Sequence, residues 1–148
     1  MRTGPVRVQP MQDISLHILD IAENSIAAAA STIAIVITED VKLDLLTVKI
    51  TDNGRGMDEK TLQRALDPFY TSKPGKRVGL GIPLLAQAAR EGGGSFDITS
   101  KPDGGTMLTA TFMLSHPDRK PLGDVDGTVR MLQLTHPEIQ LKYEFISK

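Results

Sequence analysis

Alternating hydrophobic and polar positions divide the chain into strand-like and helix-like stretches. Short apolar runs rich in Ile, Val and Thr are typical of strands, and five stretches have this character: 31–37, 45–51, 95–99, 106–114 and 139–146. Strong helix formers with helical apolar spacing predict four helices: 13–30, 58–66, 79–91 and 122–133. This order predicts an α+β fold, a two-layer sandwich in which helices cover one face of a mixed, mostly antiparallel sheet.

Capping and turn residues support these boundaries. Asp13, Asp58 and Asp124 are predicted N-caps, because a carboxylate accepts hydrogen bonds from the free N–H groups of a first helical turn. Residues 39–40 predict a turn between the first two strands, which we expect to pair antiparallel. The glycine-rich segment 101–105 predicts the hairpin turn between the third and fourth strands.

The first helix carries an unusual polar stripe. Apolar residues cover most of its circumference, which predicts a buried helix. Asp13, His17, Asp20 and Asn24 follow one another at spacings of four, three and four, so they share one side of the helix. Such a stripe faces solvent, a partner or a cleft, and the pattern alone leaves a solvated helix edge as an alternative.

Composition excludes several classes of protein. The 148 residues suit one domain, and the net charge of −1 with 4% aromatic residues and no Trp argues against nucleic-acid binding. The absence of Cys excludes disulfides and thiolate metal sites and is compatible with a cytoplasmic location. No apolar run reaches the roughly 18 residues of a membrane span, and the first residues lack the apolar block of a signal peptide.

The segment Asp52-x-Gly54-x-Gly56 follows the second strand and is the first candidate binding motif. Glycine adopts positive φ and lets a backbone approach a ligand closely. A carboxylate only accepts hydrogen bonds, so it suits a ligand with an exocyclic amino group, such as adenine. The same residues also form a common turn after a strand, which remains the alternative at this point.

The segment 69–83 is the second candidate. It carries three basic residues before a glycine-flanked helix start: Lys73, Lys76 and Arg77. The free N–H groups and the dipole of a helix N-terminus favour an anion, so this segment has the outline of a phosphate site. It is neither a Walker loop nor a dinucleotide fingerprint, because Leu84 stands at the last glycine position. An ordinary basic loop is the alternative.

Four segments follow one another in order within about residues 13–114: Asn24, the motif at 52–56, the stretch 67–81 and Gly105-Thr106. In this order and approximate spacing they resemble the GHKL ATPase superfamily, which contains gyrase, the heat-shock chaperone ATPase, sensor histidine kinases and mismatch-repair ATPases. The stretch 67–84 looks most like histidine kinases with a short lid, whereas 20–25 looks more like the mismatch-repair and anti-sigma-factor branches. The resemblance implies the histidine-kinase-like ATPase (Bergerat) fold and binding of ATP with Mg²⁺.

The resemblance also implies roles for residues near the base. Asp52 would accept a hydrogen bond from the adenine amino group, assisted by the hydroxyl of Thr106. Gly54 and Gly56 would let the chain pass close to the base, and Met57 would form a soft apolar wall.

At the phosphate end, Asn24 would give its amide oxygen to Mg²⁺, and Lys73 would add a positive charge. The other residues that the resemblance places at the nucleotide are Thr71, Gly79, Leu80 and Gly81. ATP-hydrolysing and serine-kinase relatives carry a Glu at the position of Asp20, where it orients or deprotonates the attacking group. Because the stem of Asp is one methylene shorter, a catalytic Asp20 and a structural carboxylate both remain open.

Three segments follow from these boundaries: an arm at 1–12, an ATP-binding core at 13–116 and a helix–strand extension at 117–148, which suggests an added sheet edge or a docking surface. Only about a dozen residues precede the first helix, so we expect no phosphoacceptor segment of the sensor-kinase type. The leading hypothesis is a stand-alone, cytoplasmic signal-transduction module that phosphorylates or regulates a partner protein in trans. The alternatives are an ATPase switch, coupled to lid closure or homodimerisation, and a nucleotide sensor without chemistry.

Overall fold

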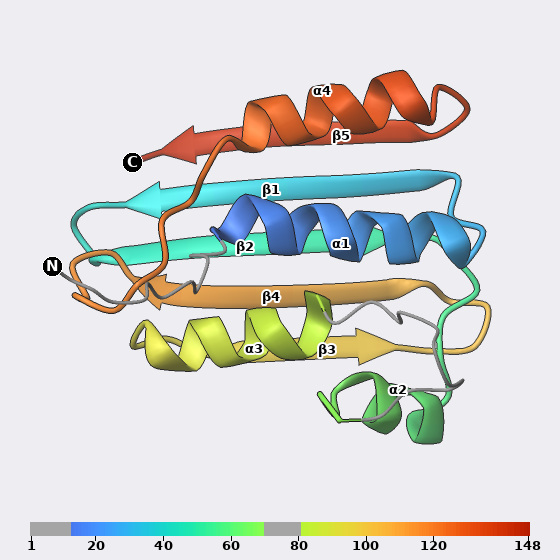
Figure 1. Ribbon diagram of the computed structural model, residues 1–148, viewed down its shortest axis with the longest axis horizontal. Coiled ribbons are helices and arrows are strands. Elements are labelled where there is room, and N and C mark those ends of the chain that lie inside the picture. Colours follow the sequence, from blue (N-terminus) through green and yellow to red (C-terminus); the bar gives the residue numbers. More distant parts are fainter. Residues whose placement is uncertain (1–12, 70–80) are drawn as a thin grey trace, which may run out of the picture.

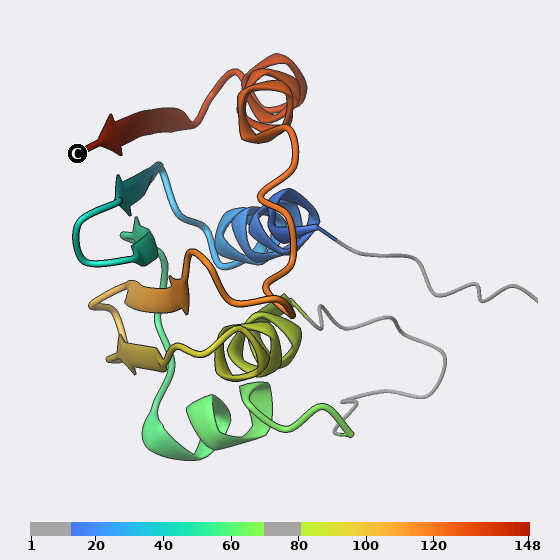
Figure 2. The same ribbon diagram turned by 90° about the vertical axis from the view of Figure 1, so that its left-hand side faces the viewer.

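The computed structural model describes residues 13–69 and 81–148, which form one layer of helices against one sheet (Figure 1). The elements are α1 (Ile14–Ala27), β1 (Thr32–Asp40), β2 (Leu45–Asp52), α2 (Glu59–Ala65), α3 (Gly81–Glu91), β3 (Phe96–Ser100), β4 (Thr106–Met113), α4 (Val125–Thr135) and β5 (Gln140–Ser147). Figure 2 shows α1, α3 and α4 on the same side of the strands. The predicted α+β sandwich is confirmed. No helix in the described ranges is long and apolar enough to cross a bilayer.

The sheet has the strand order β3-β4-β2-β1-β5. The pairs β1–β2, β2–β4 and β3–β4 are antiparallel, and β5 pairs with β1 in parallel. Parallel strands need a crossover connection, and α4 supplies it between β4 and β5. The sheet is therefore mixed and mostly antiparallel, as the sequence predicts.

The core lies between this sheet and the helices. Alternate residues of the three central strands are buried on the helical side: Ile33, Ile35, Ile37, Leu46, Val48, Ile50, Leu108, Ala110 and Phe112. The helices contribute a matching set from α1 and α3: Ile14, Ile18, Ile21, Leu85, Ala88 and Ala89. Period-two burial in strands and a nearly fully apolar α1 are what a two-layer sandwich requires.

All three predicted N-caps are confirmed. Asp13 accepts from the Leu16 N–H at 3.3 Å, and Asp58 and Asp124 accept from the N–H groups three residues later at 2.8 and 2.9 Å. The hydrogen bond from the Thr61 N–H also holds the pKa of Asp58 below its ordinary value.

Two predicted boundaries differ from the structure. Helix α1 ends at Ala27 rather than residue 30, because Ala29 adopts φ 65° and the Ala30 N–H bonds back to the Ser25 carbonyl at 3.1 Å. The turn predicted at 39–40 falls later, because β1 continues to Asp40 and the chain reverses over 41–44.

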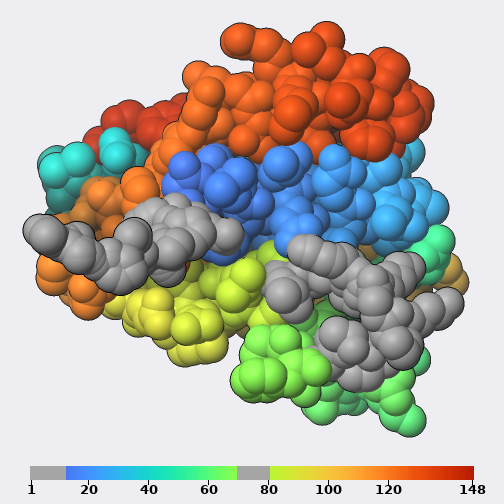
Figure 3. Space-filling view, in the orientation of Figure 1, coloured from blue at the N-terminus to red at the C-terminus, as the bar shows by residue number. Residues whose placement is uncertain are grey.

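The extension at 117–148 is built into the same sandwich. Helix α4 buries Val125, Val129 and Leu132 in the core cluster, and in Figure 3 it lies along one side of α1. On β5, burial raises the pKa of Tyr143 to about 12, and a hydrogen bond to Asp126 of α4 adds to this shift. The extension therefore adds an edge strand to the sheet, one of the two expectations from the sequence.

His17 does not lie on a solvated stripe. His17 is only 4% exposed, and its Nε2 has no hydrogen-bond partner among the described residues. Burial lowers the pKa of His17, the charge of Lys120 lowers it further, and Asp20 and Asp13 partly oppose these effects. The folded protein therefore holds this imidazole in its neutral form more strongly than the unfolded chain does.

This pKa direction predicts acid sensitivity. Below about pH 6.5 the unfolded chain binds a proton at His17 that the folded state resists, so the free energy of unfolding falls as the pH drops toward the lowered folded pKa. In His17→Leu this contribution is absent, so we expect its melting temperature to fall less between pH 8 and pH 5 than that of the wild type. Carboxylate titration is common to both proteins, and equal slopes would contradict the assignment.

Candidate functional site

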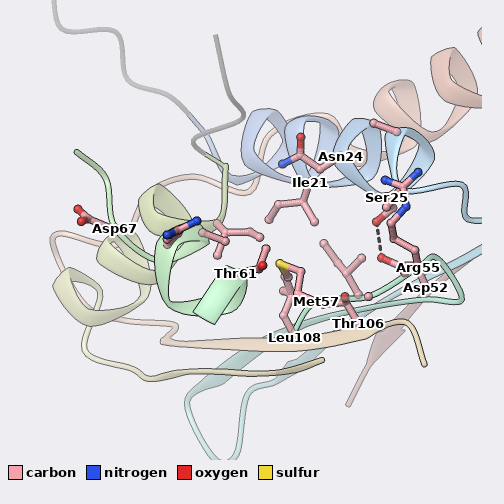
Figure 4. Close-up of a pocket in the computed structure, with 17 residues that line it drawn as sticks. Ile21, Asn24, Ser25, Asp52, Arg55, Met57, Thr61, Asp67, Thr106 and Leu108 are labelled. Atoms are coloured by element: carbon pink, nitrogen blue, oxygen red, sulfur yellow. Dashed lines mark hydrogen bonds between the residues drawn. The ribbon is translucent and has the colours of Figure 1, made fainter. Parts of the chain in front are cut away.

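A cavity of about 470 Å³ opens between α1, α2 and the ends of β2 and β4 (Figure 4). Its size lies in the range of small-molecule sites, roughly 300–1,000 Å³. Its walls are largely apolar, with contributions from Ile21, Ile50, Met57 and Leu108. Its polar lining includes Asn24, Ser25, Asp52 and Thr106. An apolar cavity with a few convergent polar groups is typical of a ligand site.

The carboxylate of Asp52 is held from two directions. Its Oδ2 accepts the Ser25 hydroxyl at 2.6 Å, drawn as the dashed line in Figure 4, and its Oδ1 accepts the Gly54 N–H at 2.8 Å. Each carboxylate oxygen has more than one acceptor site, so Asp52 can accept a further hydrogen bond from a ligand. The residue is thus oriented before any ligand arrives.

Thr106 stands next to Asp52 because the two are directly opposite in the β2–β4 register. The Thr106 hydroxyl is 2.8 Å from the Ser100 Oγ, which also lies 3.0 Å from the Gly105 carbonyl oxygen and accepts the Met57 N–H at 2.9 Å. Ser100 therefore links the β3–β4 hairpin to Met57 on the pocket wall and to the Thr106 hydroxyl by hydrogen bonds.

The two motif glycines allow close contacts within the protein. A Cβ at Gly54 would lie 2.8 Å from the Ala28 carbonyl oxygen at the end of α1. Gly56 has φ 69°, and a Cβ there would overlap the Lys101 carbonyl oxygen of the β3–β4 hairpin. Their absent side chains let the loop after β2 pack on both neighbours, which fixes the position of Asp52.

Ten of the twelve predicted site residues fall into three groups. The structure brings five of them together on the pocket: Asn24, Asp52, Gly56, Met57 and Thr106. Gly54 is not part of the pocket lining, but its N–H donates a hydrogen bond to the Asp52 carboxylate. Four others lie outside the described residues: Thr71, Lys73, Gly79 and Leu80.

Asp20 and Gly81 meet beside the pocket and are not part of its lining. A Cβ at Gly81 would lie 3.0 Å from the Asp20 Cβ and 3.2 Å from its Oδ2. Asp20 is therefore close to the first residue of α3, one helical turn before Asn24 on α1. A side chain at position 81 would therefore crowd Asp20 and Ile21 of α1.

Sequence reasoning missed several pocket residues. Ser25 lies in the stretch 20–25 that takes part in the family resemblance, but its hydrogen bond to Asp52 joins residues 27 positions apart and has no local signal. Helix α2 contributes Thr61, Arg64 and Ala65 to the pocket. Their spacing of three and four residues places them on one helical side, which was the available signal that this short helix forms a wall.

Comparisons with known proteins find a matching family model and several relatives. A family model described as "Histidine kinase-, DNA gyrase B-, and HSP90-like ATPase" matches residues 11–116. The putative sensor histidine kinase NtrY-like of Rickettsia conorii is 29% identical over 110 residues, which cover 74% of this chain and 18% of that protein. Sporulation kinase D of Bacillus subtilis is 30% identical over 112 residues, which cover 75% and 22%. The chain thus spans about a fifth of the length of these curated relatives.

A solved structure supports the fold. The Aquifex aeolicus MutL ATPase domain complexed with ADP superposes with a TM-score of 0.57 at 13% sequence identity, over 93% of this chain and 61% of that chain. At this level of identity the likeness concerns the arrangement of elements.

Proposed function

The chain belongs to the histidine kinase-, DNA gyrase B- and HSP90-like ATPase family, and on this premise we propose that its pocket binds Mg-ATP with the adenine base against Asp52. The family assignment confirms the GHKL resemblance read from the sequence, and ATP binding is the shared property of such domains. The roles of individual residues in this chain are our proposal.

The observation that carries the proposal is the oriented carboxylate of Asp52 at the end of an apolar cavity. Ser25 and Gly54 supply donors to its two oxygens, and the remaining acceptor capacity faces a donor on the ligand. The exocyclic amino group of adenine is such a donor, whereas guanine presents a carbonyl oxygen at the same ring position. Ile50, Met57 and Leu108 would contact the faces and edges of the base.

Asn24 would bind Mg²⁺ through its amide oxygen. Within residues 13–69 and 81–148 there is no group of three or more His, Cys, Asp or Glu side chains that could hold a metal ion. Magnesium commonly keeps several waters and binds through few protein oxygens together with substrate phosphates. The half-buried Asn24 on the pocket wall can supply such a single protein oxygen. The ion would then neutralise phosphate charge there.

We place the phosphates between Asn24 and the start of α3, where Gly81 lies beside Asp20. Thr71, Lys73, Gly79 and Leu80, which the resemblance names, keep their proposed contacts to the nucleotide, with Lys73 and Gly79 at the phosphates. Asp20 would orient or deprotonate the attacking group. His17, the histidine nearest to Asp20 in sequence, is buried, so we propose that the phosphoacceptor belongs to a partner protein in trans.

An ATPase switch is the second candidate. The acidic residue one turn before Asn24 favours it, because a carboxylate near the end of the nucleotide can orient water as well as a protein acceptor. The third alternative is a nucleotide sensor without chemistry. It applies if Asp20 stays packed against Gly81 and does not reach the phosphates.

Incubation with γ-labelled ATP and Mg²⁺ separates these functions. We expect label on an added partner protein for the kinase, free phosphate for the switch, and neither product for the sensor. Asp20→Asn should slow either reaction by about 100-fold or more while leaving the ATP dissociation constant within about twofold.

The matched control is Glu23→Gln, which neutralises an exposed neighbouring carboxylate that lies 3.4 Å from His136 and should leave turnover unchanged. Full turnover in Asp20→Asn would remove this residue from the mechanism.

A further inference from the structure

The outer edge of β5 is unpaired within the described part of the chain. Strand β5 is the last strand of the order β3-β4-β2-β1-β5 and has β1 on one side only (Figure 1). It has eight residues, compared with five in β3 at the opposite edge. Exposed edges of this length are templates for pairing with another strand.

The main-chain groups that point to this edge can be identified. The N–H groups of Gln140 and Lys148 donate to the carbonyls of Ser31 and Glu39 beside β1, at 2.9 and 2.8 Å. Successive residues of a strand direct their N–H and C=O groups to opposite sides, so even-numbered residues of β5 bond β1. The N–H and C=O groups of Leu141, Tyr143 and Phe145 therefore point away from the sheet.

We propose that this edge pairs antiparallel with the β5 edge of a second copy of the chain, giving a symmetric dimer with one continuous sheet. A two-fold axis perpendicular to the sheet keeps the helices of both copies on one face and makes the contact self-complementary. The axis passes between the two copies of Tyr143, so that Lys142 of each copy lies opposite Glu144 of the other.

Charge complementarity selects this register. Lys142 and Glu144 are both exposed on the sheet face away from the helices. With Tyr143 at the axis, they form two opposite-charge pairs at positions without main-chain hydrogen bonds between them, where facing side chains are closest. The neighbouring registers that keep all side chains on their faces place Lys142 opposite Lys142 or Glu144 opposite Glu144, and like charges directly opposite destabilise a sheet.

The apolar side of β5 is complementary in the same register. Phe145 is 43% exposed and lies opposite Leu141 of the other copy, on the helical face of the sheet. Pairing would shield Phe145 twice, once in each copy. Lysine on an edge strand ordinarily discourages such pairing, but here its opposite position carries a glutamate.

Charge reversal in the 148-residue chain tests the proposal. By analytical ultracentrifugation we expect the wild type to form a concentration-dependent dimer. Lys142→Glu should raise its dissociation constant at least about tenfold, because two attractive pairs become repulsive. The double variant Lys142→Glu/Glu144→Lys should restore dimerisation. Lys49→Glu is the matched control, since Lys49 is exposed on β2, inside the sheet, and should leave the dimer unchanged.

Amide hydrogen exchange provides an independent readout. Dimerisation should slow exchange at Leu141, Tyr143 and Phe145, whereas Lys142 and Glu144 should be protected in monomer and dimer alike because they bond β1. A wild-type chain that stays monomeric at every accessible concentration would overturn the proposal and leave this edge to a strand from another protein. A Lys142→Glu dimer as stable as the wild type, or a double variant that stays monomeric, would equally overturn it.

Discussion

Replacing Asp52 with asparagine is expected to weaken ATP binding by about 30-fold, or about 2 kcal/mol. In the wild type the two carboxylate oxygens accept from Ser25 and Gly54 and keep acceptor capacity for a further donor, which we propose is the adenine amino group. An amide replaces one oxygen with an NH₂ donor, so either the Ser25 hydroxyl or the Gly54 N–H loses its acceptor, and less acceptor capacity remains for the adenine amino group. Isothermal titration calorimetry with a non-hydrolysable ATP analogue measures this loss directly.

Two companion variants locate the effect. Ser25→Ala removes the 2.6 Å hydrogen bond that orients Asp52 and should weaken binding by a smaller amount, about 1 kcal/mol. Asp97→Asn makes the same chemical change at an exposed position on β3 and should bind as the wild type does. Wild-type affinity in Asp52→Asn would refute the adenine contact.

Gly56→Ala is expected to destabilise the fold by about 3 kcal/mol. The residue has φ 69°, a conformation that costs an L-residue with a Cβ roughly 1–2 kcal/mol, and the added methyl group would overlap the Lys101 carbonyl oxygen. The hairpin must move away to accept it, and that hairpin ends next to Thr106. Urea unfolding followed by circular dichroism measures the change in unfolding free energy.

Gly104→Ala is the matched control in the same hairpin. Gly104 is exposed and is not among the glycines with positive φ, and the nearest atom to a Cβ there, the Lys101 Cβ, is 3.2 Å away, so we expect a loss below about 1 kcal/mol. Equal stability of Gly56→Ala and the wild type would contradict the packing role of Gly56.

The elements were predictable because their local patterns agree with their burial. The alternating Ile residues of 31–37 and the three aspartate N-caps appear in the structure as predicted. The end of α1 was missed because the four alanines at 27–30 are all helix formers, and the positive φ of Ala29 depends on contacts outside the helix. Tertiary packing there overrides local propensity.

The site was predictable to the extent that its chemistry is local. The motif at 52–56 indicated Asp52 as a candidate binding residue. The hydrogen bond from Ser25 to Asp52 and the position of Thr61 of α2 on the pocket wall depend on contacts between residues distant in sequence. Gly54 and Gly56 were expected to let the chain pass close to the base, and this stays a prediction; within the protein, a Cβ at either glycine would crowd the Ala28 or Lys101 carbonyl oxygen, which the motif alone does not indicate. The pairing of β5 with β1 in parallel likewise depends on how α4 crosses the sheet, which no pattern in 139–146 specifies.

We propose above all that this pocket recognises an adenine nucleotide through Asp52. Calorimetric titration of the purified full chain with ATP and with GTP, both in excess Mg²⁺, tests it most directly. We expect saturable binding of ATP at one site per chain and binding of GTP at least about tenfold weaker, because the carbonyl of guanine faces an acceptor. No heat on adding ATP, or equal affinity for the two nucleotides, would contradict the account.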